Sequence, residues 1–315
     1  MAGFSVVGPI LPLYIRELGV QSEDAVRLWS GIIFSAPAVT MTLASPIWGA
    51  LSDRHGRKVM VVRAMFGGAI IIALAGLAQN VQQLAVLRAI QGALTGTVTA
   101  ATTLVATTVP RRHAGYALGL LQMAIYAGAS VGPVVGGLVA DSLGYRAAYF
   151  LTAALLFVSA LAVVFFVRED FHPPVHDDSK AHAAARVRPR ERVRRYLAPV
   201  LGSAALLSVL GVSVLVRLGG GLISSVLALF VESIAAPGAR VASLSGLVSG
   251  TSAAGGAVGA LLLGRLGDRY GHRPMLIVCS VISTLCYTLQ GFARSPGQLV
   301  ALQALTGLSM GGILA

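Results

Sequence analysis

Long apolar runs separated by short polar turns follow one another along almost the whole of the 315-residue chain. Most runs have about 20 residues, which is the length that an α-helix needs to cross the roughly 30 Å of hydrocarbon in a bilayer. The pattern predicts ten helices, at about residues 2–15, 28–51, 59–78, 84–106, 116–140, 147–167, 200–231, 242–264, 274–293 and 298–315. We therefore expect an all-α, polytopic membrane protein. The first run covers only about 21 Å at 1.5 Å per residue, so we expect this helix to lack its first turns.

Composition and charge support the membrane class and exclude a nucleic-acid partner. The chain is 56% hydrophobic and 11% charged, and its mean hydropathy is +0.79, values that leave too much apolar surface for a protein in water. The formal net charge is +12, but the basic residues stand at helix ends instead of gathering with aromatic residues on one soluble face.

The distribution of basic residues predicts the orientation of the chain. The turns after the second, fourth, sixth and eighth helices hold 17 of the 24 Lys and Arg residues, if Arg63 is counted with its adjoining turn. Loops rich in Lys and Arg remain on the cytoplasmic side of bacterial membranes. We expect the N-terminus and the long basic segment 168–196 to be cytoplasmic. This segment divides an N-terminal half, 1–167, from a C-terminal half, 197–315.

The two halves contain copies of the same charged turn. The first copy runs from Gly49 to Lys58 and the second from Gly264 to Arg273, and both 264 − 49 and 268 − 53 give 215. The same shift pairs Ser30-Gly31 with Ser245-Gly246 without a gap. The pattern predicts a duplicated bundle. Copies of helices five and six would occupy about residues 331–382, so we expect a ten-helix piece of a twelve-helix design, from a truncated gene or a partial record.

The duplicated turn resembles the signature loop of the major facilitator superfamily of secondary transporters. This resemblance implies two pseudo-symmetric six-helix halves, with the loop taking part in gating. In that family the matching Asp faces the N-terminus of helix eleven, a helix that is not among the ten expected here. The alternative is that the basic residues only fix topology. The matching residues are Gly49, Leu51, Asp53, Arg54, Gly56, Arg57 and Lys58 in the first copy and Gly264, Asp268, Arg269, Gly271 and Arg273 in the second. We expect the glycines of the first copy to allow a tight reversal.

A second pattern lies in the helix predicted over 116–140. Gly128, Gly132 and Gly136 recur every four residues and should form one stripe on which another helix packs closely, while Pro133 should bend the helix. The helix over 242–264 has small residues at Gly246, Gly250, Gly255, Gly256 and Gly259. We therefore predict that these two helices are in contact. Together with Gly137, the first set resembles the helix-five motif of drug:proton antiporters, which implies export. Ordinary small-residue packing is the alternative.

With Arg63 counted with its adjoining turn, Arg88 is the first charge that falls inside a predicted span. Together with Gln91 and Gly92 it resembles the R-x-x-Q-G motif of the same antiporters, which implies a role for Arg88 and Asp53 in proton coupling. The alternative is that the side chain only reaches out to lipid headgroups. All twelve carboxylates lie in turns or at helix ends, so no membrane-buried acid marks a proton site.

Candidate cavity residues are Arg217, Tyr126, Met123 and Gln91. Arg217 could attract an anionic substrate or reach the cytoplasmic interface. The linker residues His172, His176 and His182 could bind a metal, but their place in a charge-rich segment favours a linker without a metal site. No nucleotide-binding loop or nucleophile motif is present.

These patterns favour a non-enzymatic transporter in the bacterial inner membrane, without cofactor or metal and driven by a proton gradient. Its expected partners are the lipid bilayer, small amphipathic substrates and protons, and we expect a monomer. The alternatives are a transporter of one metabolite, possibly anionic, and a remnant without activity.

Overall fold

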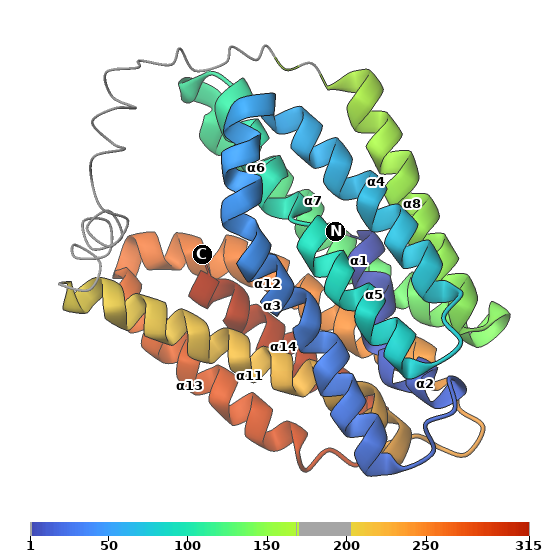
Figure 1. Ribbon diagram of the computed structural model, residues 1–315. Helices are drawn as coiled ribbons and strands as arrows, with labels where there is room; N and C mark the ends of the chain where they lie inside the picture. Colours follow the sequence, from blue (N-terminus) through green and yellow to red (C-terminus); the bar gives the residue numbers. More distant parts are fainter. Residues whose placement is uncertain (1, 168, 170–202, 315) are drawn as a thin grey trace. The chain divides into compact units, whose positions relative to one another are not determined.

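The structure is a computed structural model that describes residues 2–167, 169 and 203–314 (Figure 1). These residues are helical apart from short turns and contain no strand, which confirms the predicted all-α class. Residues 1–170 and 224–315 form one compact unit, and 171–223 form a second. The proposed linker lies almost entirely outside the described residues, and the division into two halves stays a prediction.

The first predicted helix is made of three consecutive pieces, α1 (Ala2–Val7), η1 (Gly8–Ile10) and α2 (Leu11–Glu17). The next two are α3 (Glu23–His55) and α4 (Arg57–Gly76). After α5 and α6 come α7 (Arg111–Leu143) and α8 (Tyr145–Phe166). The described part of the chain then continues with α11 (Ala204–Ile234), α12 (Val241–Tyr270), α13 (His272–Gln290) and α14 (Pro296–Leu314).

The prediction of one helix over 84–106 is wrong. The segment folds as α5 (Val81–Leu94) and α6 (Thr97–Thr108), with a break at Thr95 and Gly96. Gly96 has φ +140°, a backbone conformation that only glycine adopts without strain. Because the apolar pattern continues across the break, hydropathy alone could not reveal it.

The duplication seen in the sequence is repeated in the packing. A Cβ on Gly92 of α5 would overlap the backbone of Pro37 in α3, and a Cβ on Gly307 of α14 would overlap the backbone of Ser252 in α12. Gly307 and Ser252 stand 215 positions after Gly92 and Pro37, since 307 − 92 and 252 − 37 both give 215. Ser30 and its copy Ser245 are both fully buried. The two copies therefore pack alike at these positions, in addition to sharing a motif.

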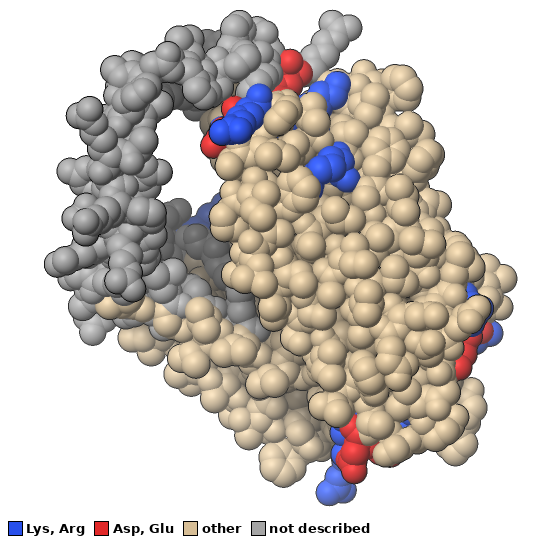
Figure 2. All heavy atoms as spheres, in the orientation of Figure 1, with Lys and Arg blue, Asp and Glu red and all other residues tan. Residues whose placement is uncertain are grey.

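Five helices of the described residues are long and apolar enough to cross a membrane: Glu23–His55, Arg57–Gly76, His113–Leu143, Tyr145–Phe166 and Val241–Leu263. Two shorter apolar stretches are Leu218–Ile234 and Pro274–Gln290. On the face shown in Figure 2, charged side chains gather near the ends of the molecule, and a wide band without them lies between. This distribution is what a bilayer requires of a lipid-facing surface.

The first helix is the centre of the largest core. Ile10, Leu11, Tyr14 and Ile15 are almost completely buried, and the Tyr14 ring lies 4.9 Å from the ring of Tyr149 in α8. The Tyr14 hydroxyl donates to the carbonyl of Ala75 in α4 at 3.1 Å. Thus α2, α4 and α8 are held together around one tyrosine pair.

Candidate functional site

The signature turn is a sharp reversal between α3 and α4. Gly56 alone separates the two helices and has φ 89° and ψ 158°, which favours glycine. The prediction that Gly49 also belongs to the reversal is wrong, because Gly49 lies within α3, which continues to His55. We call this end of the helices the signature end, and the end that carries the α7–α8 turn the opposite end.

Acidic groups surround the start of α4. The Asp53 carboxylate, in a side chain that is 69% exposed, lies 3.7 Å from the Arg57 guanidinium. The carboxylate of Glu169, which follows α8, accepts the backbone N–H of Arg57 at 2.9 Å and that of Lys58 at 2.7 Å. A carboxylate at this place satisfies two unpaired amides and is attracted by the positive end of the helix dipole. Glu169 therefore holds the signature turn to the end of α8, a contact that the sequence analysis did not find.

Replacing Glu169 with alanine should destabilise the signature turn. Loss of a helix cap costs about 1 kcal/mol, so we expect Glu169→Ala to lower the thermal unfolding midpoint of the purified protein by a few degrees. Glu169→Gln retains an acceptor oxygen and should lose less. Equal midpoints for the alanine variant and the parent protein would show that the Glu169 contact does not support the turn.

The second copy of the turn has the same backbone. Gly271 separates α12 from α13 and has φ 93° and ψ 143°, close to the values of Gly56. The Arg269 guanidinium lies 5.6 Å from the centroid of the Tyr270 ring. The side chains of Asp268 and Arg273 and the surroundings of Gly264 lie outside the described residues, so their roles stay predictions.

A cavity of about 240 Å³ opens beside the signature turn, between α3, α4 and the break that precedes α6. Its lining includes Asp53, Arg57 and Arg63. Arg63 was assigned to the turn in the sequence analysis, but it lies inside α4, with its guanidinium stacked 3.2 Å from the ring centroid of Trp48. Its Nε and Nη1 atoms are buried without a hydrogen-bond partner. The aromatic ring offsets part of the cost of burying this charge.

Arg88 is a second buried guanidinium, in α5. Its Nε and Nη2 atoms expose almost no surface and have no hydrogen-bond partner, and the same holds for the Tyr149 hydroxyl. The guanidinium carbon lies 5.9 Å from the centroid of the Tyr149 ring. Two of the three guanidinium nitrogens of Arg88 are therefore enclosed by protein. Intramembrane charges that face the interior of a bundle are typical of functional positions.

The predicted contact between the helices over 116–140 and 242–264 is confirmed, as α7 and α12 pack against each other. A Cβ on Gly246 would overlap the carbonyl of Pro133, and a Cβ on Gly137 would overlap the carbonyl of Ala242. The Ser130 hydroxyl donates to the carbonyl of Gly250 at 2.9 Å. We call this α7–α12 contact the seam. Helices approach this closely only where their facing residues are small.

The glycine stripe itself has a different neighbour from the one predicted. Gly136 packs against the backbone of Val6 in α1, and the Ser5 hydroxyl donates to the carbonyl of Gly128 at 3.3 Å; Gly132 is buried on the same stripe. The stripe thus receives α1, and the adjacent face of α7 receives α12. On α12, Gly255 and Gly259 pack against α14 rather than α7. The four-residue spacing identifies close-packing faces but not the helix that covers each one.

The candidate cavity residues are not gathered in one place by any contact that the structure shows. Tyr126 lies across the seam from Gly256, with its ring 3.5 Å from a Cβ placed on that glycine. Met123 is 59% exposed on α7, and Gln91 is buried in α5. The Arg217 side chain lies outside the described residues. A substrate role for the four stays a prediction.

Comparison with known proteins places this arrangement in a family. The sequence model of the Major Facilitator Superfamily matches residues 1–239 and 209–315. A curated relative, the multidrug resistance protein MdtG of Salmonella arizonae, is 38% identical over 313 residues, which are 99% of this chain and 75% of the relative. The protein of the same name from Enterobacter lignolyticus is 39% identical and is covered to 72%.

Solved structures show the same fold at low sequence identity. The nucleoside transporter NupG superposes with a TM-score of 0.72 at 15% identity, over 99% of this chain and 78% of that one. An inward-facing bacterial homolog of the human lysosomal transporter Spinster gives 0.70 at 16% identity, over 99% and 70% of the two chains. At such identities the likeness concerns the arrangement of helices alone.

Proposed function

Because the chain belongs to the Major Facilitator Superfamily of membrane transporters, we propose that it exports small amphipathic compounds, including drugs, in exchange for protons. The curated relatives are named multidrug resistance proteins, and their similarity extends over almost the whole chain. The observation that carries the proposal is the seam, where the antiporter-like motif of α7 packs directly on α12. Transporters of this kind expose a central site alternately to each side by rocking one half against the other.

Charged residues at two positions support the proposed coupling of transport to protons. Arg88 has two enclosed guanidinium nitrogens without partners, and Asp53 at the signature turn lies beside Arg57. In our proposal these two residues couple proton movement to the rocking of the halves, so the proton gradient supplies the energy and no cofactor takes part. We propose amphipathic substrates because the curated relatives are named multidrug resistance proteins.

The proposed location is the bacterial inner membrane, with the signature end and the N-terminus in the cytoplasm. The excess of Lys and Arg in the turns of that end supports this orientation, as 17 of the 24 basic residues belong to them or to the linker. We propose that the protein acts as a monomer, in contact with lipid. A transporter of one anionic metabolite would depend on Arg217, and no described contact favours it.

The proposal is tested in everted membrane vesicles that contain the protein. Addition of a transported drug should move protons across the membrane, and Asp53→Asn should abolish this movement. Asp24→Asn provides the control, because Asp24 is 95% exposed and contacts only Arg27 loosely at 3.7 Å. Undiminished exchange in the Asp53 variant would remove Asp53 from the mechanism, and the absence of drug-dependent proton movement in the parent protein would contradict the proposed function.

A further inference from the structure

The signature turn occurs a third time, at the opposite end of the helices. The turn between α7 and α8 repeats its spacing, since 137 − 49 and 141 − 53 both give 88, and it contains Gly137, Asp141, Gly144 and Arg146 where the first copy has Gly49, Asp53, Gly56 and Lys58. Gly144 has φ 90° and ψ 161°, within a few degrees of Gly56. The third copy therefore repeats the residue spacing of the first and the backbone conformation of its turn glycine.

In this third copy the acidic residue contacts the start of a helix in the C-terminal half. The Asp141 carboxylate accepts hydrogen bonds from the backbone N–H of Ser243 at 2.7 Å and from its hydroxyl at 2.5 Å. Ser243 is the third residue of α12. The residue before α12 is Arg240, whose carbonyl accepts the N–H of Leu244, but an arginine side chain cannot accept the unpaired amides of the first turn. Asp141 supplies the cap that α12 does not provide for itself.

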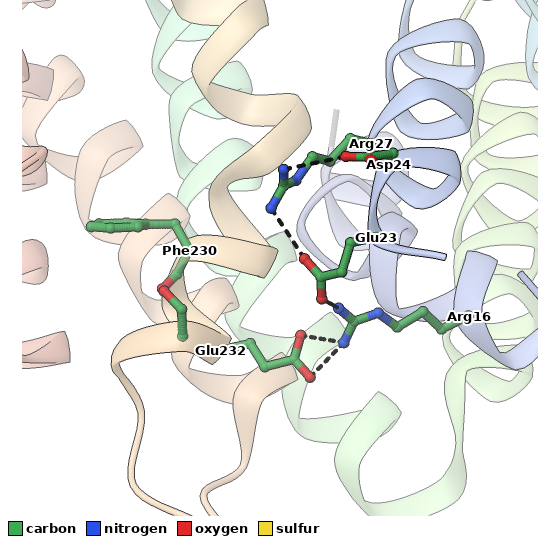
Figure 3. Close-up of polar contacts among 7 residues, drawn as sticks. Arg16, Glu23, Asp24, Arg27, Phe230 and Glu232 are labelled. Carbon is green, nitrogen blue, oxygen red and sulfur yellow. Dashed lines mark hydrogen bonds and ion pairs between the residues drawn. The ribbon is translucent and has the colours of Figure 1, made fainter. Parts of the chain in front are cut away.

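A second polar contact joins the two halves at the same end. Arg16 of α2 binds both carboxylate oxygens of Glu232 in α11, at 2.7 and 2.6 Å, and also Glu23 of α3 at 2.7 Å (Figure 3). The side chains of Arg16 and Glu232 are 30% and 37% exposed, and pairs exposed to this degree contribute little stability each. Contacts of this strength can hold one conformation and still be broken during a cycle.

The helices α7 and α12 approach each other closely only toward the opposite end. The close contacts of α7 with α12 extend from Asp141 to Ser130, and at Tyr126 the spacing is wider. Toward the other end of α7, a Cβ on Gly115 or Gly119 would meet nothing within 4 Å. In the described part of the chain, the polar contacts of the opposite end thus coincide with the closed part of the seam.

We propose that Asp141 is a gating residue of the transport cycle: with Ser243 it forms a latch that holds the halves together at the opposite end and releases when that end opens. This assignment rests on the proposed function. It gives Asp141 at one end the role that the family resemblance gives Asp53 at the other, in both cases through attraction between a carboxylate and a helix N-terminus. Asp141 is a positioning residue and need not touch the substrate.

The latch is tested by measuring distances between spin labels on the full chain in lipid nanodiscs. Labels at Leu143→Cys and Ala236→Cys flank the opposite end on the two halves, and both positions are exposed. The natural Cys279 and Cys286, which are buried, are replaced with alanine. Asp141→Ala removes the acceptor, whereas Asp141→Asn removes the charge and retains an acceptor oxygen.

We expect Asp141→Ala to raise the ratio of long to short distances about 5- to 30-fold, the effect of losing a helix cap on a two-state equilibrium. Asp141→Asn should have a smaller effect and Asp24→Ala none. If Asp141→Ala does not accumulate, Ser243→Ala, which removes one of the two hydrogen bonds, should shift the ratio in the same direction. Unchanged distances in the folded variants would overturn the latch.

Different experimental results would reject the latch and the proposed function. A shift in the distances together with an absence of drug-dependent proton movement in the parent protein would keep the latch and reject the export proposal. Proton-coupled export together with unchanged distances in Asp141→Ala would keep the export proposal and reject the latch.

Discussion

Replacing Gly246 with alanine should reduce transport at least tenfold. The added methyl group would overlap the carbonyl of Pro133 in α7, and neither helix backbone can yield locally, so α7 and α12 must move apart along the seam. Overpacking of this kind costs about 1–3 kcal/mol, and tenfold in rate corresponds to about 1.4 kcal/mol. The measurement is accumulation of an amphipathic fluorescent dye in cells that lack their own exporters.

The matched control is Gly115→Ala in α7. A Cβ at Gly115 meets nothing within 4 Å, so the same chemical change should leave export unaltered, or improve stability slightly because alanine favours helix. If both variants export as the parent protein does, the seam is not a close contact in the working transporter. If both fail, glycine itself is required in these helices and the steric argument is wrong.

Replacing Arg88 with glutamine should affect thermal stability and proton-coupled transport differently. The second half has Gln303 where the first has Arg88, since 303 − 88 is again 215. A buried guanidinium with unpaired nitrogens destabilises the fold, and its contact with Tyr149 offsets only part of this cost. We therefore expect Arg88→Gln to leave the thermal unfolding midpoint unchanged or raised, while drug-dependent proton movement falls about a hundredfold or more, as for loss of a proton-transfer group.

The control for this experiment is Arg27→Gln. Arg27 is 57% exposed and pairs with Glu23 and Asp24 at the surface, so its loss tests the general effect of removing one positive charge. Retained coupling in Arg88→Gln would mean that the charge has no part in proton transfer. A strongly lowered midpoint would instead mean that Arg88 has partners that stabilise the folded protein.

The helices could be predicted from the sequence because bilayer thickness fixes the length of apolar runs. The duplicated turn could be predicted from its repeated residue spacing. The α7–α12 contact was predicted as well, but glycine spacing marks a close-packing face and not the helix that covers it, and the stripe on α7 packs against α1. The break at Gly96 could not be predicted, because Leu94 before it and Val98 after it continue the apolar pattern.

Other features depend on residues far apart in the sequence. The Glu169 cap on α4 joins residues more than a hundred positions apart, so no local sequence pattern predicts it. Arg63 was read as part of a turn because it follows Arg57 and Lys58 closely, yet the aromatic face of Trp48 allows it to lie within the helix. The third signature copy stands at a spacing of 88 from the first, which is unrelated to the shift of 215 between the two halves.

The most direct test of the account uses the purified protein in proteoliposomes with an imposed pH gradient. The account predicts that an amphipathic dye accumulates against its own gradient when protons can move in the opposite direction, and that dissipation of the pH gradient abolishes this accumulation. Asp53→Asn should abolish it as well, and Gly246→Ala should reduce it at least tenfold. Dye movement that is indifferent to the pH gradient, or saturable transport of a single metabolite with no dye transport, would contradict it.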